Sequence, residues 1–256
     1  MEEAGIVSAI EHAGITSAAQ QAGAAPWPPR AEAGPPSANA AGSGTADSEI
    51  GVGPWVGDWP AETWYDPELL AHGDRRNVVD RYRYWHRDAV IADLDKRRHA
   101  FHVAIENWQH DFNIGTVVRN ANAFLAAEVH IVGNRRWNRR GAMVTDRYQH
   151  IRQHATVEEF AAWAAAAALP VVGIDNLPGS RPMETVTLPE RCVLLFGQEG
   201  PGLSGGARRA CAELFSIAQY GSTRSINAGV ASGIAMHAWI RAHAQPPPVT
   251  PTHSNE

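Results

Sequence analysis

Short apolar runs alternate with helix-like stretches from residue 100 onward. The runs that we expect to form strands are 101–105, 128–133, 170–175, 191–197 and 214–218. The stretches that we expect to form helices are 114–125, 156–168, 203–211 and 225–243, with Thr156 as the N-cap of the second. Because parallel strands are joined by crossover helices, this alternation predicts an α/β fold whose parallel sheet is covered by helices on both faces.

The pattern changes toward both ends of the chain. Residues 1–54 are rich in Ala, Gly and Pro, and we expect them to be disordered because they offer little apolar surface to bury. Residues 55–99 are charged and aromatic, and they predict a helical N-terminal extension of one to three helices. The main domain is expected over 100–244, with a flexible Pro-rich tail over 245–256.

Composition narrows the class of protein. The formal net charge is -5, so any contact with RNA must rest on a local basic patch. The two cysteines form no CxxC pair, and the histidines form no HExxH pattern, so no metal is expected. No apolar run is long enough to cross a membrane, and the start lacks the basic residues of a secretory signal. We therefore expect a soluble, cytoplasmic protein.

Three marked segments follow three of the expected strands, where open α/β sheets build their sites. They are NIGTVVRNA at 113–121, GQEGPG at 197–202 and IAQYGSTRSINAGVA at 217–231. In the first, Asn113 is the expected N-cap of a helix, and in the third Ser225 or Asn227 could cap the last helix. In the second, the glycines around Glu199 suggest a loop whose backbone approaches a ligand, but the spacing is neither GxGxxG nor a P-loop.

Each segment alone has an ordinary structural explanation. The first can be a capped amphipathic helix with a surface arginine, the second a strand-to-helix turn, and the third a small-residue packing face. Together, in this order and spacing, they closely resemble the three motifs of the SpoU (TrmH-type) branch of the SPOUT RNA methyltransferases, over roughly 100–243. Two departures are mild: Ala218-Gln219 stands where the family usually has Pro-Met, and Ile226 where it usually has Leu.

The resemblance implies a SPOUT fold with a deep C-terminal trefoil knot, and a homodimer that methylates the ribose 2'-oxygen of tRNA or rRNA with S-adenosyl-L-methionine. Trp239 on the final helix would suit the dimer interface. The implied cofactor-binding residues are Gly197, Gly200, Ile217, Gln219 and Ile226. The loop at Asp175 and Asn176 is a weaker candidate, because it carries no firm motif.

The implied catalytic residues are Asn113, Arg119, Glu199, Ser225 and Asn227. A guanidinium is a poor base, so Arg119 would stabilise the developing alkoxide and grip the adjacent phosphate. Glu199, Ser225 and Asn227 would orient it. In SpoU relatives this arginine faces the cofactor of the other subunit.

A basic loop over 133–153 is the candidate RNA surface. Trp137 and Tyr148 would offer rings for base stacking, and Asp146 is its single acid. The implied RNA-binding residues are Arg135, Arg136, Arg139, Arg140 and Arg147. The alternative is an ordinary solvated loop. Two further alternatives for the whole chain are a non-catalytic RNA-binding relative and a Rossmann-type oxidoreductase, the latter disfavoured by the missing GxGxxG.

Overall fold

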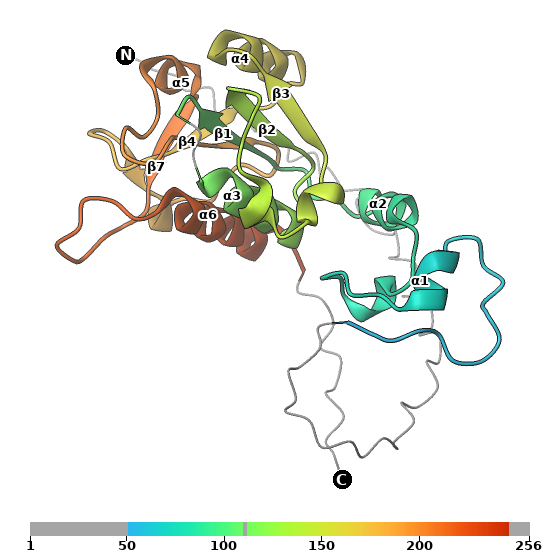
Figure 1. The fold of residues 1–256 in the computed structure, drawn as a ribbon. Coiled ribbons are helices and arrows are strands. Elements are labelled where there is room, and N and C mark those ends of the chain that lie inside the picture. Colours follow the sequence, from blue (N-terminus) through green and yellow to red (C-terminus); the bar gives the residue numbers. More distant parts are fainter. Residues whose placement is uncertain (1–50, 110–111, 246–256) are drawn as a thin grey trace, which may run out of the picture. The chain divides into compact units, whose positions relative to one another are not determined.

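A seven-stranded parallel sheet forms the centre of the protein, in the strand order β3-β2-β1-β6-β4-β7-β5 (Figure 1). The computed structural model describes residues 51–109 and 112–245. The strands are β1 His102–Asn107, β2 Val129–Gly133, β3 Ile151–His154, β4 Val171–Ile174, β5 Arg181–Pro182, β6 Val193–Phe196 and β7 Glu213–Ser216. The α-helices are α1 Pro67–His72, α2 Arg87–Asp95, α3 Asn113–Ala123, α4 Val157–Ala166, α5 Gly205–Ala210 and α6 Ala228–His243. The short 3-10 helices are η1 Asp80–Tyr82, η2 Arg139–Ala142, η3 Thr145–Arg147 and η4 Met183–Thr185.

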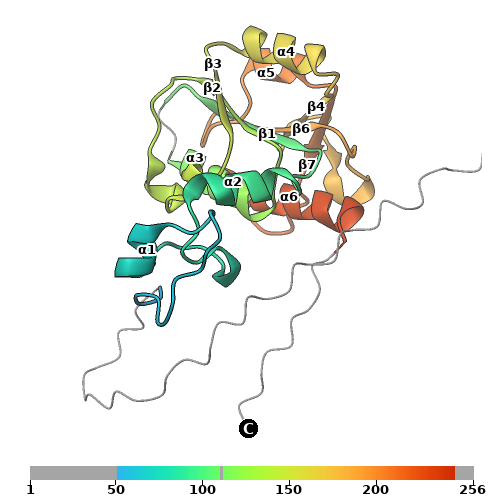
Figure 2. The ribbon, with the colours of Figure 1, turned by 90° about the vertical axis from the view of Figure 1, so that its right-hand side faces the viewer.

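Helices cover both faces of the sheet, as predicted (Figure 2). α4 and α5 lie on one face, and α3 and α6 lie on the other. Side chains alternate along β1 because successive Cβ atoms of a strand point to opposite faces. Val103 and Ile105 therefore pack in the core shared with α3 and α6, whereas Ala104 packs in the core shared with α4 and α5.

Two of the helix starts are capped as the sequence suggests. The side chain of Thr156 accepts from the backbone N–H of Glu159, and that of Asn227 accepts from the N–H of Val230. The prediction that Asn113 is an N-cap is wrong. Phe112 holds that position without a capping side chain, and Asn113 is the first helical residue. Its amide is thereby left for long-range contacts.

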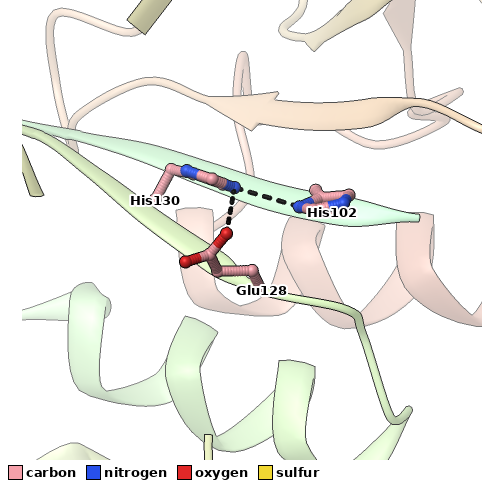
Figure 3. Close-up of side chains that lie close together, drawn as sticks. All are labelled: His102, Glu128 and His130. Carbon is pink, nitrogen blue, oxygen red and sulfur yellow. Dashed lines mark hydrogen bonds and ion pairs between the residues drawn. The ribbon is translucent and has the colours of Figure 1, made fainter. Parts of the chain in front are cut away.

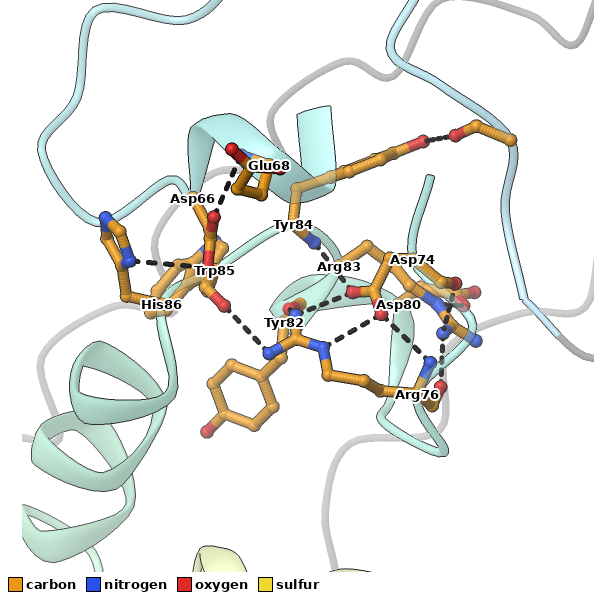
Figure 4. A network of polar contacts seen from close by, with 11 residues as sticks. Asp66, Glu68, Asp74, Arg76, Asp80, Tyr82, Arg83, Tyr84, Trp85 and His86 are labelled. Carbon is orange, nitrogen blue, oxygen red and sulfur yellow. Dashed lines mark hydrogen bonds and ion pairs between the residues drawn. The ribbon is translucent and has the colours of Figure 1, made fainter. Parts of the chain in front are cut away.

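The segment from residue 51 to α2 is organised around one buried carboxylate (Figure 4). Asp74 is fully buried, and its two oxygens accept from the guanidinium of Arg76 at 2.8 and 2.6 Å and from the N–H of Tyr84 at 2.9 Å. Val52 pairs with Asp74 through the backbone, so ordered structure begins before the expected boundary at residue 55. The predicted disorder of 1–50 and of 246–256 concerns residues outside the described ranges.

The structure corrects three expectations. The segment 133–153 is not one loop, because it folds into η2, η3 and the edge strand β3. Tyr148 is buried beside Tyr82 and Val90 and cannot stack on a base. Trp239 is 2% exposed and donates to the backbone carbonyls of Pro189 and Glu190, so it is a core residue rather than an interface residue. Among the described helices, none has both the length and the apolar character needed to cross a membrane.

Candidate functional site

A pocket of about 100 Å³, partly open to solvent, lies at the carboxyl ends of β4 and β6. Ile174 and Phe196, the last residues of these two strands, form part of its wall. The other residues that line it come from the loops after β4, β6 and β7 and from the start of α6: Asp175, Asn176, Gly197, Gln198, Glu199, Gly200, Gly202, Ile217, Gln219, Ser225, Ile226, Ala228 and Ala231. The structure thus brings all five predicted cofactor-binding residues to one pocket, together with Glu199 and Ser225.

The glycine-rich loop after β6 folds back on itself. A Cβ at Gly197 would lie 2.1 Å from the carbonyl carbon of Gly202, a separation that no side chain can adopt. Gln198 and Gly202 pair through both backbone hydrogen bonds, and the carboxylate of Asp175 accepts from the N–H of Leu203 at 2.8 Å. The loop is therefore a tight backbone hairpin tied to the end of β4.

Glu106 and Trp108, which the sequence did not single out, form hydrogen bonds that hold this loop in place. Glu106, fully buried near the end of β1, accepts from the N–H of Ser204 at 2.7 Å and from the indole N–H of Trp108 at 2.8 Å. Gln198 accepts from the N–H of Trp108 at 3.0 Å. An acidic residue at the end of an otherwise apolar run was the available signal for Glu106, because a buried carboxylate needs donors.

Asn113, Glu199 and Asn227, one from each marked segment, form a hydrogen-bonded cluster. Glu199 accepts through Oε2 from the amides of Asn113 at 2.9 Å and Asn227 at 3.2 Å, and from the N–H of Ala228 at 3.1 Å. The amide of Asn227 also donates to Asn113 Oδ1 at 2.8 Å. The carboxylate lies at the N-terminus of α6, where a negative charge is favoured by the helix dipole. The cluster therefore ties the pocket loop to the first turns of α3 and α6.

Arg119 stands apart from this cluster. Its side chain is exposed on α3, it does not line the pocket, and it makes no hydrogen bond or ion pair with any described residue. Within one chain Arg119 makes no contact with Glu199, Ser225 or Asn227, so their role in orienting it stays a prediction. Ser225 instead lies exposed at the pocket, where its carbonyl accepts from the hydroxyl of Thr223.

The two departures from the family pattern have structural consequences. The N–H of Ala218 donates to Glu184 at 3.0 Å, a bond that a proline could not make. Gln219 lines the pocket, and its Oε1 is buried with no hydrogen-bond donor among the described residues. Buried polar atoms are rarely left without a partner, so this oxygen marks a place where a ligand donor would be favoured.

The predicted RNA-binding arginines lie exposed on and around η2 and η3, which pack against α3. Arg139 pairs with Asp146 at 3.1 Å and lies over the ring of Trp137 at 5.3 Å. Trp137 is itself partly packed against the core. This exposed group of residues, which we call the arginine surface, consists of Arg135, Arg136, Arg139, Arg140 and Arg147.

Both thiols of the chain are buried or half-buried. Burial raises the pKa of Cys192 to about 12, and burial together with the charge of Glu106 raises the pKa of Cys211 to about 12. Because the thiolate is the nucleophile, neither cysteine is suited to covalent catalysis at neutral pH.

Comparison with known proteins agrees with this geometry. The model of the SpoU rRNA Methylase family matches residues 100–237. An uncharacterized tRNA/rRNA methyltransferase of Mycobacterium bovis (strain BCG / Pasteur 1173P2) is 30% identical over 175 residues, which are 66% of this chain and 53% of the relative. The chain spans about half the length of the curated relatives it matches.

Solved structures share the fold. The AdoMet-bound rRNA methyltransferase from Sinorhizobium meliloti aligns with a TM-score of 0.51 and 28% identity, over 58% of this chain and 59% of that chain. An RNA 2'-O ribose methyltransferase aligns with a TM-score of 0.52 and 20% identity, over 57% of this chain and 58% of that chain.

Proposed function

Because the chain belongs to the SpoU rRNA Methylase family, we propose that it is an S-adenosyl-L-methionine-dependent RNA methyltransferase that modifies the ribose 2'-oxygen of tRNA or rRNA. The observation that carries the proposal is the convergence of three separate loops on one pocket, with the cluster of Asn113, Glu199 and Asn227 beside it. A cytoplasmic location fits an RNA substrate of this kind. The RNA 2'-O ribose methyltransferase shares only its fold with this chain, and this shared fold is its whole support for ribose as the target.

The pocket fits the proposed cofactor. The apolar side chains of Ile217 and Ile226 can flank an adenine ring, and Gly197 and Gly200 leave backbone groups accessible. The buried Oε1 of Gln219 can accept a hydrogen bond from an amine of the ligand. When bound, S-adenosyl-L-methionine supplies an electrophilic methyl group on its sulfonium.

Arg119 is the proposed catalytic cation. A guanidinium that meets the 2'-oxygen as its proton leaves stabilises the developing negative charge, and it can hold the adjacent phosphate at the same time. The cluster around Glu199 keeps the pocket loop and α6 in register, so that the ribose oxygen can be aligned with the methyl group. An alternative mechanism would methylate a base after a cysteine thiolate forms a covalent bond with it. The raised pKa values of Cys192 and Cys211 disfavour that mechanism.

A homodimer would complete this site. Since Arg119 does not reach the pocket of its own chain, we propose that it serves the pocket of a second copy. Val230 and Ile234, one turn apart on α6, are 54% and 39% exposed and offer apolar surface for that contact. We further propose that the chain is knotted, as its resemblance to the SPOUT methyltransferases implies.

The test is transfer of labelled methyl from S-adenosyl-L-methionine to total tRNA and to rRNA, followed by nucleoside analysis. A 2'-O-methyl nucleoside is the expected product. A labelled base would overturn the ribose assignment. Cofactor binding without transfer to either RNA would favour a non-catalytic RNA-binding protein.

A further inference from the structure

His102, Glu128 and His130 lie close together (Figure 3). They lie on the face of the sheet where Trp163 of α4 packs against His130. His102 is the first residue of β1, Glu128 precedes β2, and His130 is the second residue of β2. They lie near the amino ends of these strands, whereas the pocket lies at the carboxyl ends of β4 and β6. No short sequence motif unites them, because the pairing of β1 with β2 brings them together.

The ligand atoms of these three side chains all lie within 4.8 Å of one another. His102 Nδ1 and His130 Nε2 are 3.1 Å apart, and His130 Nε2 and Glu128 Oε2 are 3.8 Å apart. Two nitrogen ligands of a tetrahedral zinc ion are separated by about 3.3 Å, as follows from Zn–N bonds of about 2.0–2.1 Å. The two imidazoles are thus already at ligand spacing, and a small rotation of the half-buried Glu128 brings its oxygen to the same range.

We propose that His102, Glu128 and His130 bind a divalent transition-metal ion of the zinc class. Two imidazoles and a carboxylate are a ligand set that suits such ions and leaves coordination positions for water. The ion would bridge the amino ends of β1 and β2, far from the reacting groups of the proposed methyl transfer. Its role is therefore structural, and it holds whether or not the proposed function is correct.

The neighbouring residues fix the ligands in place, as outer residues do in metal sites. His130 Nδ1 lies 3.0 Å from His154 Nε2, so a proton on Nδ1 leaves Nε2 free to face the ion. Arg152 donates to Glu128 Oε1 at 3.1 Å, which leaves Oε2 for the ion. The ring of Trp163 lies 3.9 Å from that of His130 and closes the site from above.

A competing explanation needs no ion. His102, His130 and His154 can form a chain of neutral imidazoles, each donating to the next. In that arrangement a proton occupies the space between His102 Nδ1 and His130 Nε2, and Glu128 serves only to pair with Arg152. The two explanations differ in measurable respects: only the metal site should bind a divalent ion, and only there should removal of the negative charge of Glu128 weaken that binding.

The experiment uses the full chain, stripped of metal with a chelator and titrated with Zn²⁺ by calorimetry. We expect one site per chain that raises Tm by about 5–10 °C at a hundredfold excess over Kd. Co²⁺ should give the intense visible absorption of a site with low coordination number. Glu128→Gln and His102→Ala should each weaken binding at least tenfold and abolish the Co²⁺ absorption.

The matched control is His150→Gln. His150 pairs with Asp95 at 2.8 Å and is exposed, but no third ligand is near it among the described residues. It should leave Zn²⁺ affinity unchanged. The proposal is overturned if Zn²⁺ neither binds in a one-to-one ratio nor raises Tm. It is equally overturned if Glu128→Gln, with its circular dichroism spectrum unchanged, binds Zn²⁺ as the unaltered protein does.

Discussion

At the scale of single residues, a substitution of Arg119 should change the rate of methyl transfer without changing the affinity for the cofactor. Because it is exposed and has no partner among the described residues, Arg119→Ala should keep the fold and the affinity for S-adenosyl-L-methionine. Loss of one group that stabilises a developing oxyanion costs about 10²–10³ in rate. We expect that loss in labelled methyl transfer, with unchanged cofactor binding by calorimetry. Arg209→Ala, which removes another exposed arginine, on α5, is the control. Full activity of Arg119→Ala would remove it from the catalytic site.

Replacing Gln219 is expected to affect thermal stability and cofactor affinity in opposite directions. Its buried Oε1 has no donor among the described residues, so Gln219→Leu should leave Tm unchanged or raise it. If the oxygen accepts from the cofactor, the same variant should bind S-adenosyl-L-methionine about fivefold more weakly, because a hydrogen bond contributes about 1 kcal/mol. Calorimetry and thermal melting measure the two effects. Equal affinity would show that this oxygen does not contact the cofactor.

The buried carboxylate of Asp74 should make the stability of the protein depend on pH. Burial by itself raises the pKa of Asp74, but hydrogen bonds from Arg76 and from the N–H of Tyr84 outweigh it, so the pKa lies below 3.8. The folded state therefore binds this proton less readily than the unfolded state. Its stabilisation is present above pH 3.8 and is lost as pH falls through the folded-state pKa.

We expect Asp74→Asn to lower the free energy of unfolding by about 3 kcal/mol at neutral pH, because Arg76 loses its buried counter-charge. The difference should shrink at acidic pH. Urea unfolding at several pH values measures it. Asp80→Asn is the control, since Asp80 is 98% exposed and its pairing with Arg83 should contribute little. A difference that does not change with pH would mean that the charge of Asp74 is not what stabilises this segment.

At the scale of elements, the close approach of α3 to η2 depends on Gly115. A Cβ at this position would lie 2.7 Å from the backbone nitrogen of Ala142, so one element must move. We expect Gly115→Ala to destabilise the protein by about 1–3 kcal/mol, although alanine favours helices. Gly206→Ala in α5 is the control, since its Cβ would meet Val157 at an ordinary 3.6 Å. Thermal melts compare the two. If the two variants are equally stable, η2 can move away from the added methyl group without a loss of stability.

The elements also show how far the sequence could be interpreted. Strands buried on both faces, such as β4 and β6, are continuous apolar runs and were predicted. The edge strand β3 was missed because its sequence, IRQH, is polar and its identity as a strand depends on pairing with β2. The glycine-rich loop was predicted from its residues. Glu106 and the metal candidates were not, because their partners are distant in sequence and only the sheet register brings them together.

At the scale of the whole molecule, the proposed binding of RNA must overcome a net charge of -5. The arginine surface is the described region that can do so, because its five exposed arginines are accompanied by the single acid Asp146. Each phosphate that a protein cation neutralises on a single strand contributes about -0.7 to the slope of log K against log salt concentration. Binding through this surface is therefore measurable as a salt dependence, independently of which RNA is the substrate.

Replacing Arg139 and Arg140 together with alanine should reduce that slope in magnitude by about 1–1.5 and weaken RNA binding at low salt. The control replaces Arg209 and Arg241, which are also exposed, with alanine. Both double variants have the same net charge, so a difference between them reports position and not charge. Fluorescence anisotropy with labelled tRNA across a salt series gives both slopes. If the two variants behave alike, RNA responds to the overall charge of the protein and the arginine surface has no particular part in binding it.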